Sequence, residues 1–280
     1  MMLPIAEPMT SHAVTARDGV SIAYLSIGHG PAVIVVPGAL ATAATYADFA
    51  RHLAARFTVH VIERRGRGAS GPQGEDYGIS TERDDVLALQ EATGAAYLVG
   101  HSYGGLIALE AARRNASFEK LALYEPGVSV RGSIPVGWIP DFEQRLAAGK
   151  PLDALAGFSV AAGPARARMM PLWLMRLLLP RVMGRAALTD LLSLLPTTIR
   201  EHRELARLDG SVANYREISA NVLLMSGGRS GLDWVEPAFA ALSQVVPSSD
   251  RLEFPTLDHF GIDKGAPATV ASAVGDYFAA

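Results

Sequence analysis

The 280-residue chain contains no cysteine. Disulfide bonds, thiolate ligands for metals and thiol nucleophiles are therefore excluded. Charged residues are also scarce, at 19% of the chain, and the formal net charge is only −3. Because the basic residues are scattered along the sequence, no charged segment favours a nucleic acid as a partner.

Long hydrophobic runs are missing as well. The most apolar stretch, residues 171–180, is interrupted by Arg176 and is shorter than the ~20 residues that a membrane span requires. Residues 1–11 show no basic segment followed by an apolar one, so a signal peptide is not expected. We therefore expect a cytoplasmic protein with no membrane partner.

Short apolar runs alternate along the chain with amphipathic helical patterns. The runs are rich in β-branched residues, which is typical of strands buried on both faces. They lie at residues 32–36, 58–62, 96–99, 121–124 and 221–225, and the helical patterns lie near 42–55, 81–93, 103–115, 234–246 and 266–278. This alternation predicts an α/β fold with a mostly parallel central sheet flanked by helices.

One long segment, residues 127–218, breaks the alternation. It contains no convincing strand, and helical patterns near 141–148, 171–183, 187–195 and 198–208 are separated by Gly and Pro. We interpret this segment as a helical cap inserted between two strands. The predicted core then consists of residues 1–126 and 219–280.

The strongest functional signal is the G-x-S-x-G pattern of residues 100–104, which lies between a predicted strand and a predicted helix. In that context the pattern is typical of a sharp turn that presents a serine at the top of the sheet. Gly100 and Gly104 provide the space that a strained backbone at Ser102 needs. The N-terminus of the following helix favours a developing negative charge. Ser102 is the predicted nucleophile.

A serine nucleophile needs a base, and His259 has the most suitable position among the seven histidines. It follows the last predicted strand and precedes the last predicted helix, so it is expected at the C-terminal edge of the sheet, beside the Ser102 turn. The others lie in terminal, loop, helical or buried strand positions without a surrounding motif. His101 is expected to point away from Ser102.

These segments resemble those of the α/β-hydrolase superfamily, in its cap-bearing branch. Pro37-Gly38, residues 63–68 and residues 258–260 add to the resemblance, which covers nearly everything except the predicted cap. It implies the α/β-hydrolase fold and a serine hydrolase. These motifs indicate the fold and the catalytic residues well but say little about the substrate.

The acid that completes the triad is less clearly marked. Many relatives carry it after the strand that follows the cap, but the corresponding residue here is Ser230, which has no carboxylate. Other branches carry it at the end of the preceding strand, where this chain has Glu125. We favour Glu125 as the acid that orients His259, with Asp233 as the alternative. A purely structural role for Glu125 in holding the cap remains open.

The resemblance also suggests the oxyanion hole and part of the substrate pocket. The two backbone donors are expected to be the N–H groups of Tyr103, after the nucleophile, and of Ala39, in the loop after the third strand. Most apolar residues of the predicted cap are expected to pack in its core. A few should line an apolar pocket over Ser102, and we name Leu40, Met170 and Trp173 as candidates.

The sequence therefore predicts a hydrolase that cleaves an ester, lactone or related acyl bond of a small, apolar substrate through an acyl-enzyme. No metal and no cofactor are expected, a small molecule is the expected partner, and a homodimer stays open. Alternatives are C–C bond or amide hydrolysis and a lyase of the hydroxynitrile type, in which Ser102 and His259 move a proton without an acyl-enzyme. A non-catalytic binder of small molecules is the third class.

Overall fold

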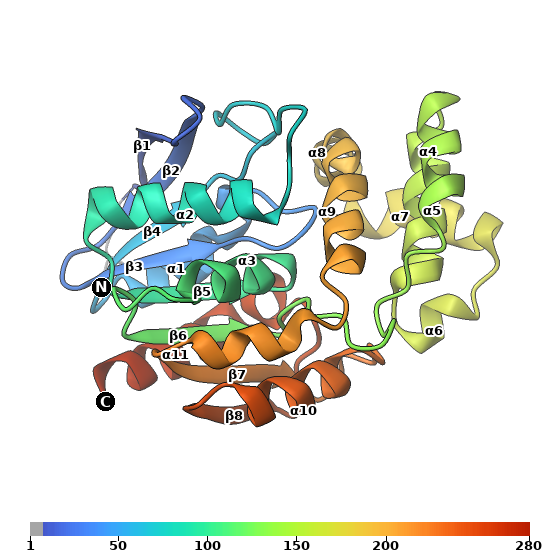
Figure 1. The fold of residues 1–280 in the computed structure, drawn as a ribbon. Helices are drawn as coiled ribbons and strands as arrows, with labels where there is room; N and C mark the ends of the chain where they lie inside the picture. The colour runs from blue at the N-terminus through green and yellow to red at the C-terminus, as the bar shows by residue number, and fades with distance from the viewer. Residues whose placement is uncertain (1–7) are drawn as a thin grey trace, which may run out of the picture.

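A single twisted sheet forms the centre of the molecule (Figure 1). Within residues 8–280, its eight strands have the order β1-β2-β4-β3-β5-β6-β7-β8. β1 and β4 both run antiparallel to β2, and all other neighbours are parallel. The strands are β1 (Thr10–Thr15), β2 (Ser21–Ile27), β3 (Ala32–Val36), β4 (Thr58–Ile62), β5 (Tyr97–His101), β6 (Lys120–Tyr124), β7 (Asn221–Gly227) and β8 (Ser249–Phe254). The predicted α/β fold with a mostly parallel sheet is confirmed.

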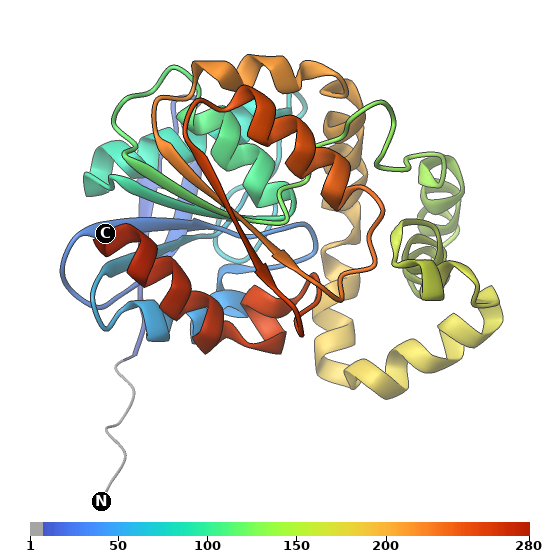
Figure 2. The same cartoon turned by 90° about the horizontal axis from the view of Figure 1, so that it is seen from below.

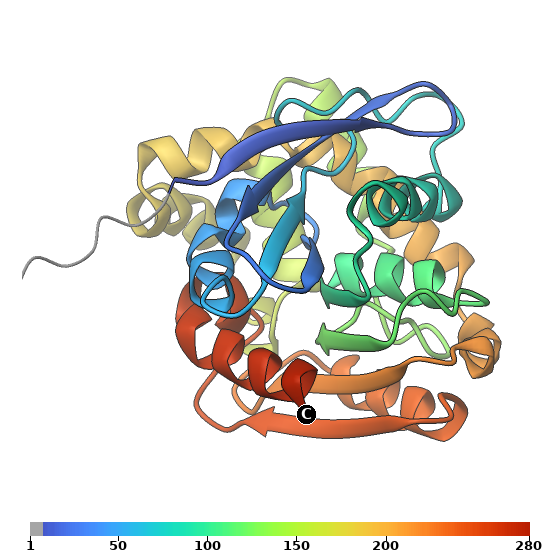
Figure 3. The ribbon, with the colours of Figure 1, turned by 90° about the vertical axis from the view of Figure 1, so that its left-hand side faces the viewer.

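Helices cover both faces of this sheet, as Figures 2 and 3 show. One layer contains α2 (Ile79–Thr93), α3 (Tyr103–Ala112) and α10 (Val235–Val245), and the other contains α1 (Ala47–Leu53) and α11 (Pro267–Ala279). Side chains of β3 alternate between the two layers: Ile34 packs in the first apolar cluster and Val35 in the second, and both are fully buried. Burial on both faces explains why the central strands are continuous apolar runs.

The chain between β6 and β7 forms helices beyond the carboxyl ends of the central strands, seen at the right of Figure 1. We call α4–α9 the cap helices. They are α4 (Ile139–Ala147), α5 (Pro151–Ala162), α6 (Ala165–Arg168), α7 (Leu172–Met183), α8 (Arg185–Ser193) and α9 (Leu195–Arg207), and a short 3₁₀ helix (Ser211–Glu217) follows. An apolar cluster of their own, around Trp138, Phe142 and Leu155, packs them together.

The structure, a computed structural model, describes residues 8–280. The first seven residues lie outside it, and with them most of the stretch in which no signal peptide is expected. In the part of the chain that is described, no helix is both long enough and apolar enough to cross a bilayer.

Candidate active site

The turn after β5 holds Ser102 in a strained conformation. Its backbone angles, φ 53° and ψ −123°, lie in a region that residues other than glycine rarely occupy. The flanking glycines are required by space: a Cβ at Gly104 would lie 2.2 Å from the carbonyl oxygen of Val36, and one at Gly100 would lie 2.7 Å from that of Gly104. The turn therefore presents a partly exposed Ser102 at the base of a cavity.

Glu125 is the carboxylate that the structure brings to His259. It follows β6 directly, has a positive φ of 42° and is fully buried. Its Oε2 atom lies 2.6 Å from Nδ1 of His259. Asp233, the alternative acid, is not brought there: its side chain is 68% exposed and pairs with Arg168.

His259 and Ser102 line the same cavity. Because Nδ1 of His259 faces Glu125, its Nε2 is the ring nitrogen left to exchange a proton with a group in the cavity. Among the described residues, no hydrogen bond joins the His259 ring to the Ser102 hydroxyl. Such catalytic hydrogen bonds are often long without substrate and shorten when it binds.

The loop after β3 directs the backbone N–H of Ala39 away from two buried arginines. The carbonyl of Gly38 accepts hydrogen bonds from Arg64 at 3.0 Å and from Arg67 at 2.8 Å. In a trans peptide the N–H of the next residue points the opposite way, so the N–H of Ala39 is directed away from the two arginines. Ala39 and Ser102 line the same cavity, and a Cβ at Gly38 would lie 3.2 Å from Cβ of Ser102.

Tyr103 supplies the second N–H group next to Ser102. It is the first residue of α3, and the first N–H groups of a helix have no partner within the helix. Its ring is buried, with the Arg64 guanidinium 4.7 Å from the ring centre. The structure thus gathers Ala39 and Tyr103, the two predicted donors, around Ser102.

His101 joins two loops of the site, the loop after β3 and the loop that carries His259. Its Nε2 lies 2.8 Å from the carbonyl oxygen of His259; since a carbonyl only accepts, Nε2 carries the hydrogen. Nδ1 therefore accepts from the Tyr46 hydroxyl at 2.6 Å, and that hydroxyl accepts from the N–H of Gly38 at 3.0 Å. Burial lowers the pKa of His101 well below its usual value, which keeps the ring neutral. No sequence motif marks Tyr46 for this role.

A buried ionic cluster connects the Gly38 loop to the cap helices. Glu201 of α9 is fully buried and contacts Arg67 and also Arg64, the latter at 3.0 Å. Arg64 also pairs with Glu82 of α2 at 2.6 Å. Burial would raise the pKa of Glu82, but the charge and hydrogen bonds of Arg64 outweigh it and hold that pKa below its usual value. The sequence alone did not predict that these arginines would pair with a residue of α9.

Glu201→Gln tests the contribution of this cluster. We expect the free energy of unfolding to fall by about 3 kcal/mol, because the substitution leaves the buried Arg67 guanidinium without a counter-charge. Urea denaturation followed by circular dichroism measures the change. The matched control is Glu143→Gln on α4, whose ion pair with Arg203 is exposed and should contribute less than about 1 kcal/mol. Equal losses in the two variants would show that the cluster does not anchor α9.

The cavity above Ser102 has a volume of about 460 Å³. Leu40 lines it as predicted, and its cap side is formed by apolar residues of α5, α7 and α8: Leu155, Phe158, Met175, Leu179, Met183 and Leu191. Met170 and Trp173 are not among the lining residues, so this part of the prediction is wrong. The lining residues of α7 are spaced by four and share one face; Trp173 lies on the other face, 67% exposed, and Met170 precedes the helix.

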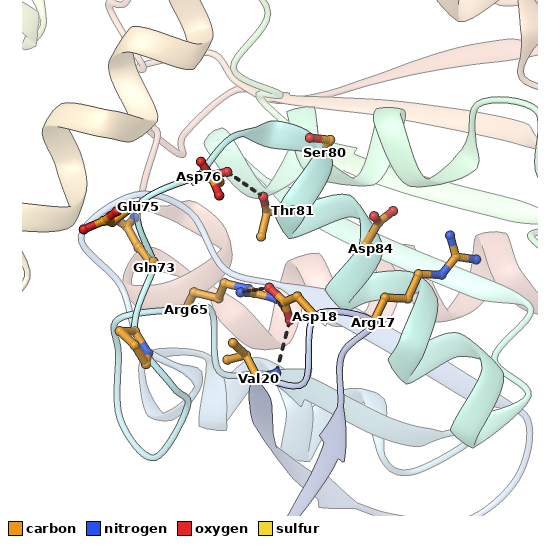
Figure 4. Close-up of a pocket in the computed structure, with 12 residues that line it drawn as sticks. Arg17, Asp18, Val20, Arg65, Gln73, Glu75, Asp76, Ser80, Thr81 and Asp84 are labelled. Carbon is orange, nitrogen blue, oxygen red and sulfur yellow. Dashed lines mark hydrogen bonds and ion pairs between the residues drawn. The ribbon is translucent and has the colours of Figure 1, made fainter.

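A second hollow, of about 330 Å³, lies near the turn between β1 and β2 (Figure 4). Most of the residues that line it are polar or charged, and one of them, Arg65, pairs with Asp18 at 2.6 Å and with the buried Asp85 at 2.6 Å. It shares no lining residue with the cavity above Ser102. Ser102 and His259 therefore line only the cavity above Ser102, and the buried Glu125 contacts His259 from behind it.

The fold and the comparisons with known proteins define the class of this protein: it has an α/β-hydrolase fold, built on a mostly parallel sheet. More particularly, the chain belongs to the alpha/beta hydrolase family, whose family model matches residues 33–273. A solved structure of an alpha/beta hydrolase from Sphaerobacter thermophilus superposes with a TM-score of 0.81 and 28% sequence identity, covering 95% of this chain and all of that one.

Curated relatives with named activities match shorter parts of the chain. N-formylmaleamate deformylase of Pseudomonas putida is 31% identical over 169 residues, which cover 57% of this chain and 63% of that protein. The pimeloyl-(acyl-carrier protein) methyl ester esterase of Xanthomonas campestris is 33% identical over 97 residues, covering 35% of this chain and 37% of the esterase. The matches thus span less than two thirds of the length of either relative.

Proposed function

We propose that the protein is a serine hydrolase that cleaves an ester, lactone or related acyl bond of a small, largely apolar molecule through an acyl-enzyme. The observation that carries this proposal is the contact of 2.6 Å between Glu125 and Nδ1 of His259, together with the cavity that His259 and the strained Ser102 both line. This is the arrangement in which a carboxylate orients a histidine to activate a serine. No metal and no cofactor enter the proposal.

The proposed reaction has two halves. In the first, Oγ of Ser102 attacks the substrate carbonyl while Nε2 of His259 takes its proton, and Glu125 stabilises the imidazolium that forms. The N–H groups of Ala39 and Tyr103 stabilise the oxyanion of the tetrahedral intermediate. The intermediate collapses when His259 gives the proton to the leaving oxygen. In the second half, His259 takes a proton from water, which attacks the acyl-enzyme, and returns that proton to Ser102.

The lining of the cavity supports a small apolar substrate. Leucine, methionine and phenylalanine side chains from the cap helices predominate, and a volume of about 460 Å³ lies within the range of small-molecule sites. We propose that residues 127–218 act as a cap that shapes this cavity. Flexible methionines at two of its positions, Met175 and Met183, would adapt to acyl groups of different shape.

Amide hydrolysis is a second candidate, because one relative is named a deformylase. An ester and a formamide share the chemical step proposed here, attack of Ser102 on a carbonyl carbon, and differ in the leaving atom that His259 must protonate. A panel of p-nitrophenyl esters from acetate to octanoate, together with N-formyl amides, measures kcat/KM for both bond types.

Labelling with a fluorophosphonate probe tests the serine mechanism directly. We expect one adduct per chain, mapped by peptide mass spectrometry to Ser102, and no labelling of heat-denatured protein. Pre-incubation with a substrate ester should slow the labelling. Cleavage of a cyanohydrin without a trappable acyl-enzyme would favour the lyase alternative, and a folded protein that binds the esters but neither labels nor turns them over would favour the non-catalytic binder.

A further inference from the structure

Ser230 occupies the loop after β7 and contacts the proposed catalytic carboxylate. Its side chain is buried, and its Oγ lies 2.8 Å from Oε2 of Glu125. The same carboxylate oxygen lies 2.6 Å from Nδ1 of His259. One oxygen of Glu125 is therefore held between a serine hydroxyl and the imidazole.

The direction of this hydrogen bond follows from the chemistry of its partners. An ionised carboxylate only accepts hydrogen bonds, so the Ser230 hydroxyl donates to Oε2. The other oxygen, Oε1, accepts from the backbone N–H of Gly227 at 2.9 Å. With both oxygens held from the β7 side, the carboxylate plane is fixed and Oε2 faces the imidazole.

The loop that carries Ser230 is itself attached to the loop that carries His259. The N–H of Ser230 donates to the carbonyl of Gly227 at 3.1 Å, and the N–H of Arg229 donates to that of Leu257 at 2.8 Å. Leu257 precedes His259 by two residues, so this hydrogen bond fixes the loop of Ser230 relative to the loop of His259. Glu125 comes from the neighbouring strand and has three side-chain torsions. Its hydrogen bonds with this loop fix its orientation.

We propose that Ser230 is a positioning residue for the proposed reaction: its hydroxyl holds Oε2 of Glu125 toward Nδ1 of His259. In many relatives the loop after β7 carries the acid of the triad. In this chain the same loop orients the carboxylate of Glu125, which the adjacent strand supplies. This inference rests on the proposed role of Glu125 as the triad acid.

Ser230→Ala should lower kcat of the best p-nitrophenyl ester roughly tenfold, the size expected for loss of one hydrogen bond to a charged group, and leave KM within a factor of about two. Ser230 also lines the cavity, so a contact with substrate is the competing role, and it would change KM. Ser230→Thr keeps the hydroxyl and should recover most of kcat. The matched control is Ser248→Ala, just before β8, where the serine hydroxyl donates to the exposed Asn221 side chain.

A double-mutant cycle separates positioning from mere stabilisation. If Ser230 acts through Glu125, Ser230→Ala should cause almost no further loss of kcat in a Glu125→Gln background, whereas a structural role would lower both backgrounds equally. Unchanged kcat in Ser230→Ala, equal losses in the two backgrounds, or failure of Ser230→Thr to exceed Ser230→Ala would each overturn the inference. Thermal denaturation shows whether Ser230→Ala folds. If it does not, the inference is tested by comparing kcat of Ser230→Thr with kcat of wild type and of Glu125→Gln/Ser230→Thr.

The failure of this inference is distinguishable from failure of the proposed function. Retention of activity by Glu125→Gln itself would remove the triad assignment, whatever Ser230 does. Loss of activity in Glu125→Gln together with a fully active Ser230→Ala would remove only the role of Ser230.

Discussion

Replacing Ser102 by alanine is expected to lower kcat for ester hydrolysis by roughly a millionfold, to the level left by substrate binding and oxyanion stabilisation alone. The reason is that no other hydroxyl takes the place of Ser102 on the strained turn after β5, between the N–H groups of Ala39 and Tyr103. The measurement is steady-state hydrolysis of the best p-nitrophenyl ester, supported by single-turnover kinetics to detect any residual acyl-enzyme.

The fold should be unaffected by this substitution, because Ser102 contributes a small, partly exposed side chain. Thermal denaturation and circular dichroism of Ser102→Ala should match those of wild type. Ser248→Ala, far from the cavity on the opposite end of the sheet, serves as the control and should keep full activity. A Ser102→Ala variant with more than about one per cent of wild-type kcat would contradict nucleophilic catalysis by this residue.

Glu125→Gln is expected to lower kcat by roughly four orders of magnitude, as substitution of the acid by its amide does in a serine triad. The amide leaves the packing nearly unchanged but cannot stabilise the imidazolium, and its NH₂ group would favour the wrong tautomer of His259. Asp233→Asn should keep kcat within a factor of about two, because Asp233 is exposed and pairs with Arg168.

The comparison of these two variants decides between the two acids that the sequence leaves open. It is made with the same ester and over a range of pH, so that a shifted optimum is not taken for lost activity. A strong loss in Asp233→Asn with a mild one in Glu125→Gln would mean that the β7–α10 loop rearranges when substrate binds and that the contact of 2.6 Å between Glu125 and His259 is not the one used in catalysis.

The strands of the central sheet were the easiest part of the fold to predict. β3 and β4 have the predicted limits because each is a short run of buried β-branched residues. The cap helices were harder. α5 and α6 were not predicted, since α5 is rich in alanine and contains Gly157, with little contrast between its faces, and α6 is only four residues long. Such helices are stabilised by packing against neighbours, which local sequence does not reveal.

The candidate site also contains residues that the sequence predicts and residues that it does not. Ser102, Glu125 and His259 follow from motifs at the ends of strands; in the structure Ser102 and His259 line one cavity, and the buried Glu125 contacts His259. Tyr46, Ser230 and Glu201 were not predicted to contact the site, because their roles depend on tertiary contacts: Glu201 reaches Arg67 across 134 positions of sequence. Trp173 was wrongly assigned to the pocket because hydrophobicity alone does not indicate which face of a helix meets the cavity.

The position of His259 after β8, an edge strand of the sheet, has a consequence for the synthesis of the protein. During translation, Ser102 and Glu125 leave the ribosome before His259, the base proposed to activate Ser102. Within residues 8–280, β8 pairs only with β7, and the His259 loop is held in place by contacts with α11, with the loop after β7 and with His101. In the proposed mechanism, Ser102 of a nascent chain therefore lacks its base until the segment that carries His259 has been synthesised and has folded.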